Sequence, residues 1–179
     1  MENFAFKTGL SFNYLTILKR EINSYQPKPV YLKKFPGFNQ EYIEQLNLLK
    51  IKTSKQLFLR IKNKNDVLKL SEQTKITCND LLELFKLSDL VRINGVGPVF
   101  ARMMLEIEVD GTFKMANSNS KILYNKLTEL NKEKNYTKAK FTTKDIQYCI
   151  DFAKKLPKNV CSKLRLNKKI KKMELEEFE

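Results

Sequence analysis

The sequence predicts an all-α protein in which two copies of one helical unit pack as a single domain with pseudo-two-fold symmetry. Glycine and proline are scarce, with five of each among 179 residues, so few positions interrupt regular structure. Apolar residues recur at helical spacing along most of the chain. In addition, residues 32–51 resemble residues 90–109 at an offset of 58 positions, which indicates an internal repeat.

Residues 1–28 are expected to form an N-terminal helical extension. One apolar stripe runs through this segment and ends before Pro27, and it consists of Phe12, Leu15, Leu18 and Ile22. The first ten residues have two interpretations, because the alternation of Phe4 and Phe6 also fits a short strand.

Side-chain caps mark the starts of several later helices. Thr53, Thr77 and Thr142 are each followed three positions later by Gln or Asp, which is the spacing of a capping box. Thr112 follows Gly111 and is expected to cap a short helix. Together with the apolar periodicity, these signals predict helices at roughly 39–49, 53–61, 65–75, 77–86, 98–107, 112–117, 120–131, 142–155 and 162–176.

The internal repeat defines the main domain. Three stretches align between its copies: 32–38 with 90–96, Thr53 with Thr112 after a one-residue slip, and 77–81 with 142–146. The domain therefore spans residues 29–157, with repeats at about 29–89 and 90–157. Units this small cannot each bury a sizeable core, so we expect them to pack against each other.

The net charge of +14 favours polyanionic partners such as DNA, RNA or an acidic membrane surface. Lysine, however, outnumbers arginine 29 to 5, which an AT-rich genome would also produce, so charge alone does not decide the function. Residues 158–179 are basic and then acidic, and form either a solvated helix or a tail that follows the phosphates of a nucleic acid. The candidate phosphate contacts of this basic tail are Lys168, Lys169, Lys171 and Lys172.

Several function classes are disfavoured by what the composition lacks. The chain has no histidine, which removes the commonest general base and metal ligand, and no Walker phosphate-binding pattern. Its three cysteines are far apart and suit a reducing cytoplasm, so neither a metal site nor a cofactor is expected. We therefore predict a cytoplasmic protein that is not an enzyme; a lyase-type repair activity using a lysine is the remaining enzymatic alternative.

The turn formed by Gly95, Val96, Gly97 and Pro98 is the best candidate site. Two glycines permit a tight turn that presents its backbone amides, and proline is favoured at the first position of the helix that follows. Free amides at the positive end of a helix form a ready anion site. Lone glycine pairs often only connect helices, however, so the structural interpretation stays open beside the functional one.

The run G-V-G-P-V-F-A-R at residues 95–102 resembles the helix-hairpin-helix motif, and especially the hairpin of family X DNA polymerases. The resemblance implies that the amides of Gly95, Val96 and Gly97 hold a DNA phosphate, with a monovalent cation when DNA is bound. Arg102 and Arg92 are the corresponding basic contacts. The chain departs from the pattern at Val99 and Phe100, where many such hairpins carry a basic residue, and this edge could instead face a protein.

The first copy of the hairpin is more degenerate. Gly37 is retained, Asn39 replaces the second glycine as a residue that tolerates left-handed geometry, and Lys33 and Lys34 precede the turn. This copy serves either as a second phosphate site or as structure only.

Several blocks in order also resemble the family called domain of unknown function 4332, which consists of tandem helix-hairpin-helix units. The blocks are F-P-G-F-x3-Y-I-x2-L, I-K-T-x3-L-F, S-D-L-V-R-I-N-G-V-G and D-F-A-K-K-L-P, within residues 29–157. The expected function is non-catalytic, largely sequence-independent binding of DNA through its backbone phosphates, with RNA as an alternative ligand. The rival interpretation is a protein–protein or homodimerisation scaffold that uses the same helices. No membrane or small-molecule partner is expected.

Overall fold

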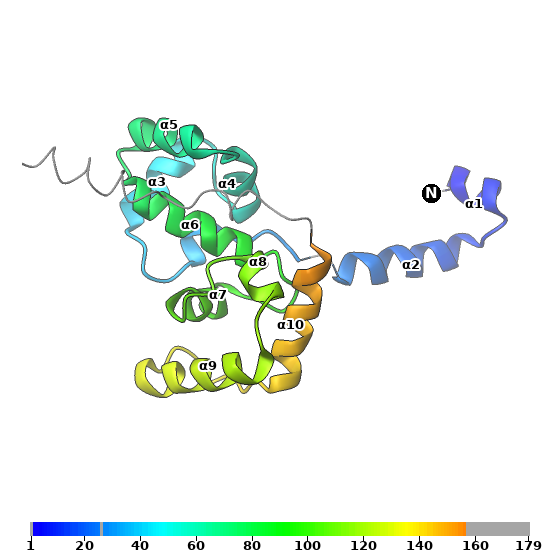
Figure 1. Cartoon of the computed structure of the whole chain (residues 1–179). Helices are drawn as coiled ribbons and strands as arrows, with labels where there is room; N and C mark the ends of the chain where they lie inside the picture. The colour runs from blue at the N-terminus through cyan, green and yellow to red at the C-terminus, as the bar shows by residue number, and fades with distance from the viewer. Residues whose placement is uncertain (1, 26, 157–179) are drawn as a thin grey trace, which may run out of the picture.

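The computed structural model describes residues 2–25 and 27–156 of the chain (Figure 1). In these residues the regular secondary structure is helical, with one isolated backbone bridge between Tyr31 and Thr53, and the all-α prediction is confirmed. In chain order the elements are α1 (Glu2–Thr8), α2 (Phe12–Tyr25), the 3-10 helix η1 (Leu32–Lys34), α3 (Gln40–Leu48), α4 (Ser54–Arg60), α5 (Lys64–Thr74), α6 (Cys78–Leu90), α7 (Pro98–Glu106), α8 (Thr112–Ala116), α9 (Ser120–Lys134) and α10 (Thr143–Lys155).

One ambiguity of the sequence is resolved, and one expected helix end is wrong. The first residues form α1, the helical one of the two interpretations left open, since a helix bonds its own backbone groups and needs no neighbouring strand. Helix α6 continues to Leu90 instead of ending at 86, because Leu87 and Leu90 extend its apolar spacing and no glycine intervenes before Gly95. The helix predicted at 162–176 and the basic tail lie outside the described residues.

The predicted caps are largely present. Thr53 and Thr142 form capping boxes with Gln56 and Asp145, and the Thr77 hydroxyl accepts the amide of the residue three positions later. These bonds satisfy amides that have no partner within their own helix, and they explain where three of the helices begin.

Thr112 has a different role from the cap expected of it. Gly111 is the N-cap of α8, and Thr112 is the first residue of the helix. The amide and hydroxyl of Thr112 both donate to Oδ2 of Asp89, at 2.8 and 3.0 Å. Thr53 therefore corresponds to Gly111 rather than to Thr112, at the offset of 58, and the one-residue slip is not needed.

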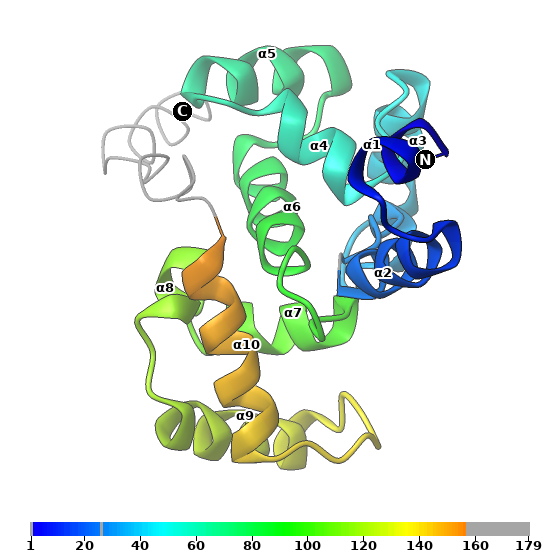
Figure 2. The same cartoon turned by 90° about the vertical axis from the view of Figure 1, so that its right-hand side faces the viewer.

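Helix α6 lies at the centre of the fold. Figure 2 shows it between α4 and α5 on one side and α7 on the other, and all three pack against it. Eight of its thirteen residues are buried, as expected for a helix that is surrounded by others. The remaining layer is formed by α8, α9 and α10, and one continuous apolar core extends from Leu32 to Ala153.

The backbone follows the same course in residues 31–53 and 89–111. Gly37 and Gly95 both have positive φ, at +86° and +89°, and α3 and α7 both have nine residues and start 58 positions apart. Each helix is followed by a residue with left-handed backbone, Lys50 after α3 and Glu108 after α7, again 58 positions apart. The next amide then donates to the carbonyl oxygen five residues earlier at 2.9 Å, from Ile51 to Leu46 and from Val109 to Met104. The similarity seen in the sequence is thus also a similarity of local structure.

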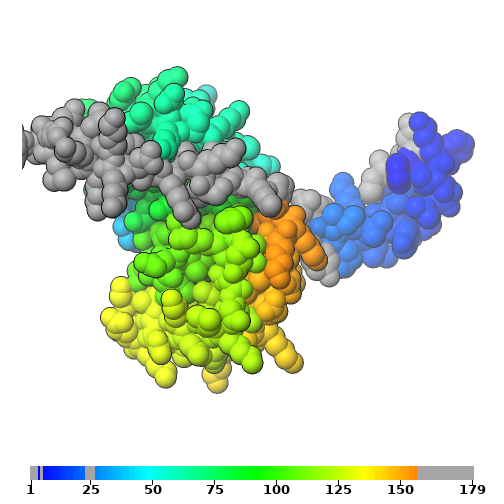
Figure 3. All heavy atoms as spheres, viewed as in Figure 1, coloured from blue at the N-terminus to red at the C-terminus, as the bar shows by residue number. Residues whose placement is uncertain are grey.

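Helices α1 and α2 project from the rest of the molecule as an arm (Figures 1 and 3). Leu15 is the one buried side chain between residues 11 and 22, and the other apolar residues of this stretch are exposed. None of the helices in the described part of the chain is long and apolar enough to span a bilayer.

Candidate nucleic-acid interface

The turn between α6 and α7 contains two glycines, of which one has a positive φ and the other is extended. Gly95 has φ +89°, which side chains rarely adopt, and the next amide, of Val96, donates to the carbonyl of Ile93 at 3.1 Å. Gly97 is extended, with φ −87° and ψ 174°, and acts as the N-cap of α7, with Pro98 in the first turn. The helix before this turn is α6, which ends at Leu90.

Three amides are open at the start of α7. Among the hydrogen bonds of the described residues, none uses the amides of Gly97, Val99 and Phe100, and Gly97 has no side chain to cap the helix. The positive end of the helix dipole adds to these donors. The set differs from the one inferred from resemblance, because the Val96 amide is already bonded within the turn.

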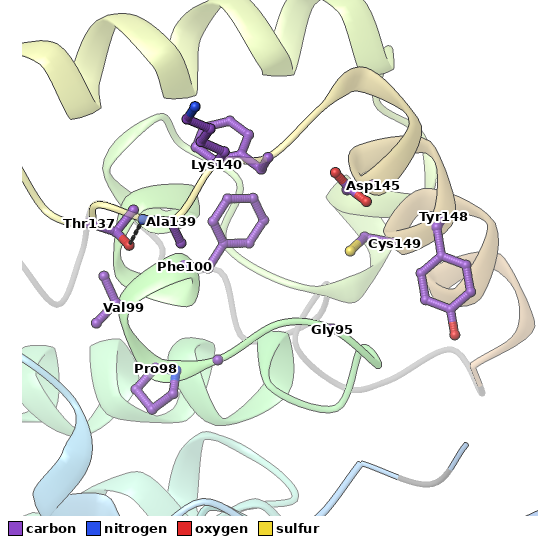
Figure 4. Close-up of a pocket in the computed structure, with 12 residues that line it drawn as sticks. Gly95, Pro98, Val99, Phe100, Thr137, Ala139, Lys140, Asp145, Tyr148 and Cys149 are labelled. Atoms are coloured by element: carbon purple, nitrogen blue, oxygen red, sulfur yellow. Dashed lines mark hydrogen bonds between the residues drawn. The ribbon is translucent and has the colours of Figure 1, made fainter. Parts of the chain in front are cut away.

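A groove of about 530 Å³ opens beside this helix end (Figure 4). One wall is the hairpin from Gly95 to Phe100, a second is the loop between α9 and α10, and a third is the first half of α10. The aromatic side chains on its walls are Phe100, Phe141 and Tyr148, and Phe100 packs edge-on against Phe141 at 5.4 Å between ring centres. The apolar residues at the turn, which depart from the expected basic pattern, therefore form part of a cavity.

The groove has both positively and negatively charged side chains at its rim. Lys140 belongs to its lining, and Lys138 and Lys144 are exposed nearby in the chain. The carboxylate of Asp145 accepts the hydroxyl and the amide of Thr142, and these bonds lower its pKa, so it is ionised at neutral pH. An anion in the groove is therefore favoured at the hairpin and disfavoured near the start of α10.

Tyr148 and Cys149 attach α10 to the turn. The Tyr148 hydroxyl accepts from Nδ2 of Asn94 at 2.9 Å, which holds the ring at the mouth of the groove. The Cys149 sulfur lies 3.8 Å from the Asn94 carbonyl oxygen, and burial raises the pKa of this thiol to about 11. Cys149 is thus protonated at neutral pH and is a packing residue rather than a nucleophile.

The Arg102 side chain is held by other groups of the protein. Its guanidinium donates to the Pro36 carbonyl oxygen at 2.7 and 3.1 Å, pairs with Glu83 at 2.6 Å and lies over the Phe38 ring at 5.2 Å. Its side chain is only 11% exposed. This residue, expected from the resemblance to contact DNA, ties α7 to the first hairpin.

Arg92 is likewise engaged. It pairs with Asp89 at 2.6 Å and stacks over Phe58 at 4.4 Å. Asp89 is fully buried and also accepts both bonds from Thr112, so the arginine balances a buried charge at the junction of α6 and α8. Its structural use differs from the phosphate contact predicted for it.

The turn at Gly37 resembles the turn at Gly95 in its backbone, but a side chain caps the helix that follows it. Gly37 provides the positive φ, whereas Asn39, at φ −64°, is not left-handed as expected. Oδ1 of Asn39 instead accepts the amide of Glu41 at 3.0 Å, which removes one donor that an anion would need. Lys33 and Lys34 are exposed on η1, and Lys33 lines a smaller groove of about 320 Å³.

Sequence reasoning missed the loop at residues 135–142 and Tyr148. This loop carries Lys138 and Lys140 between two aromatic residues, Tyr136 and Phe141, and such an alternation of basic and aromatic residues is the signal that could have found it. Its contact with the hairpin joins residues more than 35 positions apart, and no local pattern predicts that contact. No cluster of three or more potential metal-ligating acids and cysteines occurs among the described residues.

Comparison with known proteins gives one result. No curated protein and no solved structure matches the chain. A family model described as Domain of unknown function (DUF4332) matches residues 36–156, which include the hairpin turns, the groove and its loop. Since this match covers well over half of the 179 residues, the chain belongs to the DUF4332 family.

Proposed function

We propose that this protein binds nucleic acid through the sugar–phosphate backbone, without catalysis, and that α6, the turn and α7 act as a helix-hairpin-helix. The observation that carries the proposal is the set of open amides at Gly97, Val99 and Phe100, which meet at the positive end of a nine-residue helix beside a groove. The resemblance of residues 95–102 to DNA-binding hairpins supports the same ligand. DNA is the expected polymer, and RNA is tested beside it.

The groove indicates which form of nucleic acid suits the site. A phosphate on the α7 amides would place its nucleotide beside Phe100, Phe141 and Tyr148, and stacking of one base on aromatic side chains contributes roughly 1–3 kcal/mol. A base in a duplex is already stacked and paired, so it cannot enter without an energetic cost. We therefore expect strands with an unpaired end to bind better than blunt duplexes, with little dependence on base sequence.

The site can be blocked without disturbing the fold. A Cβ added at Gly97 meets no atom within 4 Å, and the φ of this residue suits any side chain. In Gly97→Asp the new carboxylate would accept the open amides as an N-cap and repel a phosphate, while preserving or slightly raising the stability of α7. Loss of these charge-assisted contacts is expected to weaken binding about 10- to 100-fold.

Asn39→Asp is the matched control. It adds the same charge at the equivalent N-cap of α3, where a side chain already occupies an amide. Fluorescence anisotropy with labelled blunt duplex, overhang duplex, single-stranded DNA and RNA, over a salt titration, measures both variants. If Gly97→Asp and Asn39→Asp weaken binding equally, the hairpin is not the site and general electrostatics accounts for the effect. Absence of salt-dependent binding by the wild type would refute the proposal itself.

A further inference from the structure

Eight of the seventeen large apolar side chains that are exposed in the described chain lie on the arm formed by α1 and α2 and their connection. Its aromatic side chains Phe4, Phe6, Phe12 and Tyr14 are 46–91% exposed, and Ile17 and Ile22 are more than half exposed. Soluble monomers seldom leave so many large apolar side chains of one short segment exposed to water. The arm also stands away from the body, so none of the helices α3 to α10 covers this surface (Figures 1 and 3).

We propose that the arm is a homodimerisation surface, on which the α1–α2 pair of one chain packs against that of a second copy. Two such pairs would form a four-helix arrangement in which the same surface is buried on both chains. This inference is independent of nucleic-acid binding, because it rests on a different part of the molecule.

The exposed apolar area of the arm, summed over all sides of both helices, is an upper bound on what a dimer can bury. Fully buried Phe and Tyr side chains each remove about 150–250 Å² from water, so the four aromatic residues at their observed exposure offer about 500 Å². Ile17, Ile22 and the neighbouring leucines of the arm bring the total close to the roughly 800 Å² that each partner contributes to a standard interface.

The charge of the arm fits a second copy of this chain. Residues 1–25 contain three basic and two acidic side chains, a net charge of +1, whereas residues 27–156 contain 24 basic and 14 acidic side chains, a net charge of +10. Two copies that met through the body would bring these charges together, whereas the arms can meet with little repulsion. Pairing through the arm therefore keeps the two basic bodies apart.

The position of Glu21 argues for a protein partner over a lipid surface. It lies four residues after Ile17, on the same side of α2, so insertion of that side into acyl chains would take a carboxylate with it. At a protein interface a carboxylate can stay at the polar rim while the apolar residues around it are buried.

The test is the mass of the full chain in solution without nucleic acid, measured by light scattering and sedimentation over a wide concentration range. We expect twice the chain mass of 21.1 kDa for the wild type. The double variant Phe6→Glu/Ile17→Glu should dissociate at least about 100-fold more readily, since each dimer carries every substitution twice. Its matched control is Phe113→Glu/Ile122→Glu, because these residues on α8 and α9 are of the same two types and are also exposed, at 49% and 57%.

A dimer that persists in the control and dissociates in the arm variant, with unchanged circular dichroism, supports the proposal. A wild type that is monomeric at every concentration overturns it, and so does an arm variant that remains dimeric. If the monomeric wild type instead floats with phosphatidylcholine vesicles and the arm variant does not, the arm is a membrane-binding element and the proposal is wrong. None of these outcomes bears on whether the hairpin binds DNA.

Discussion

Replacement of Arg102 by alanine should destabilise the protein rather than weaken nucleic-acid binding alone. The guanidinium donates two hydrogen bonds to one shared acceptor, the Pro36 carbonyl oxygen, and counted together as one bond from a charged donor they contribute about 1.5–3 kcal/mol. The pair with Glu83 adds less than about 1 kcal/mol, because Glu83 is 41% exposed, and the contact with Phe38 adds about 0.5–1 kcal/mol. We therefore expect a loss of about 3 kcal/mol for Arg102→Ala.

Urea denaturation followed by circular dichroism measures this loss, and for a chain of this size it corresponds to a fall in Tm of about 6–12 °C. Glu83→Gln is the control, since it removes only the half-exposed ion pair and should cost less than about 1 kcal/mol. If Arg102→Ala unfolds within about 0.5 kcal/mol of the wild type but binds DNA much more weakly, the arginine is a phosphate contact and the structural assignment is wrong.

Two further predictions concern backbone strain and a buried thiol. Gly95→Ala should lower the free energy of unfolding by about 1–2 kcal/mol, because alanine disfavours φ +89°. Gly97→Ala should change it by less than about 0.5 kcal/mol, and equal losses for the two variants in urea denaturation would contradict this. Because the pKa of Cys149 is about 11, its thiolate fraction at pH 8 is about one in a thousand. The rate of its labelling by iodoacetamide, mapped by mass spectrometry, should therefore rise about tenfold per pH unit above pH 8. Rapid labelling at pH 8 would refute the burial argument. The raised pKa stabilises the fold below pH 9, and this contribution is lost as the pH rises from 9 towards 11.

The helices themselves were predictable from local patterns. Threonine followed three residues later by Gln or Asp marks a helix start because the bonds involved lie within one turn. Helices α4, α6 and α10 each begin directly after such a threonine. Where a local signal was ambiguous, the outcome depended on more distant packing. Helix α6 extends to Leu90 because Leu87 and Leu90 continue its apolar spacing and its last turn is buried between other helices, while no side-chain cap marks this end.

The candidate site was predictable only in part. Gly95 and Gly97 could be recognised because a tight turn before a helix with an early proline has a short-range signature, and the turn has the expected course. The identity of the charged groups at the site could not be predicted in this way. Arg102 and Arg92 lie near the turn in sequence, yet their guanidiniums are held by Pro36 and Asp89, whereas Lys140 lines the groove from a loop that follows two further helices.

The sequence by itself determined the all-α fold, most of the helix starts, and two turns with the same backbone at an offset of 58 residues, because all of these follow from interactions within a few positions. The open amides also follow from a local difference, since Gly97 has no side chain where Asn39 caps α3. Only the tertiary structure decided which lysines and aromatic rings lie beside these amides. The physical reason is that the packing of the helices decides which groups a side chain contacts. The carbonyl that binds Arg102, for example, lies 66 residues away in the sequence. The function proposed for this protein accordingly rests on a groove that exists only after α7, α10 and the loop before it have come together.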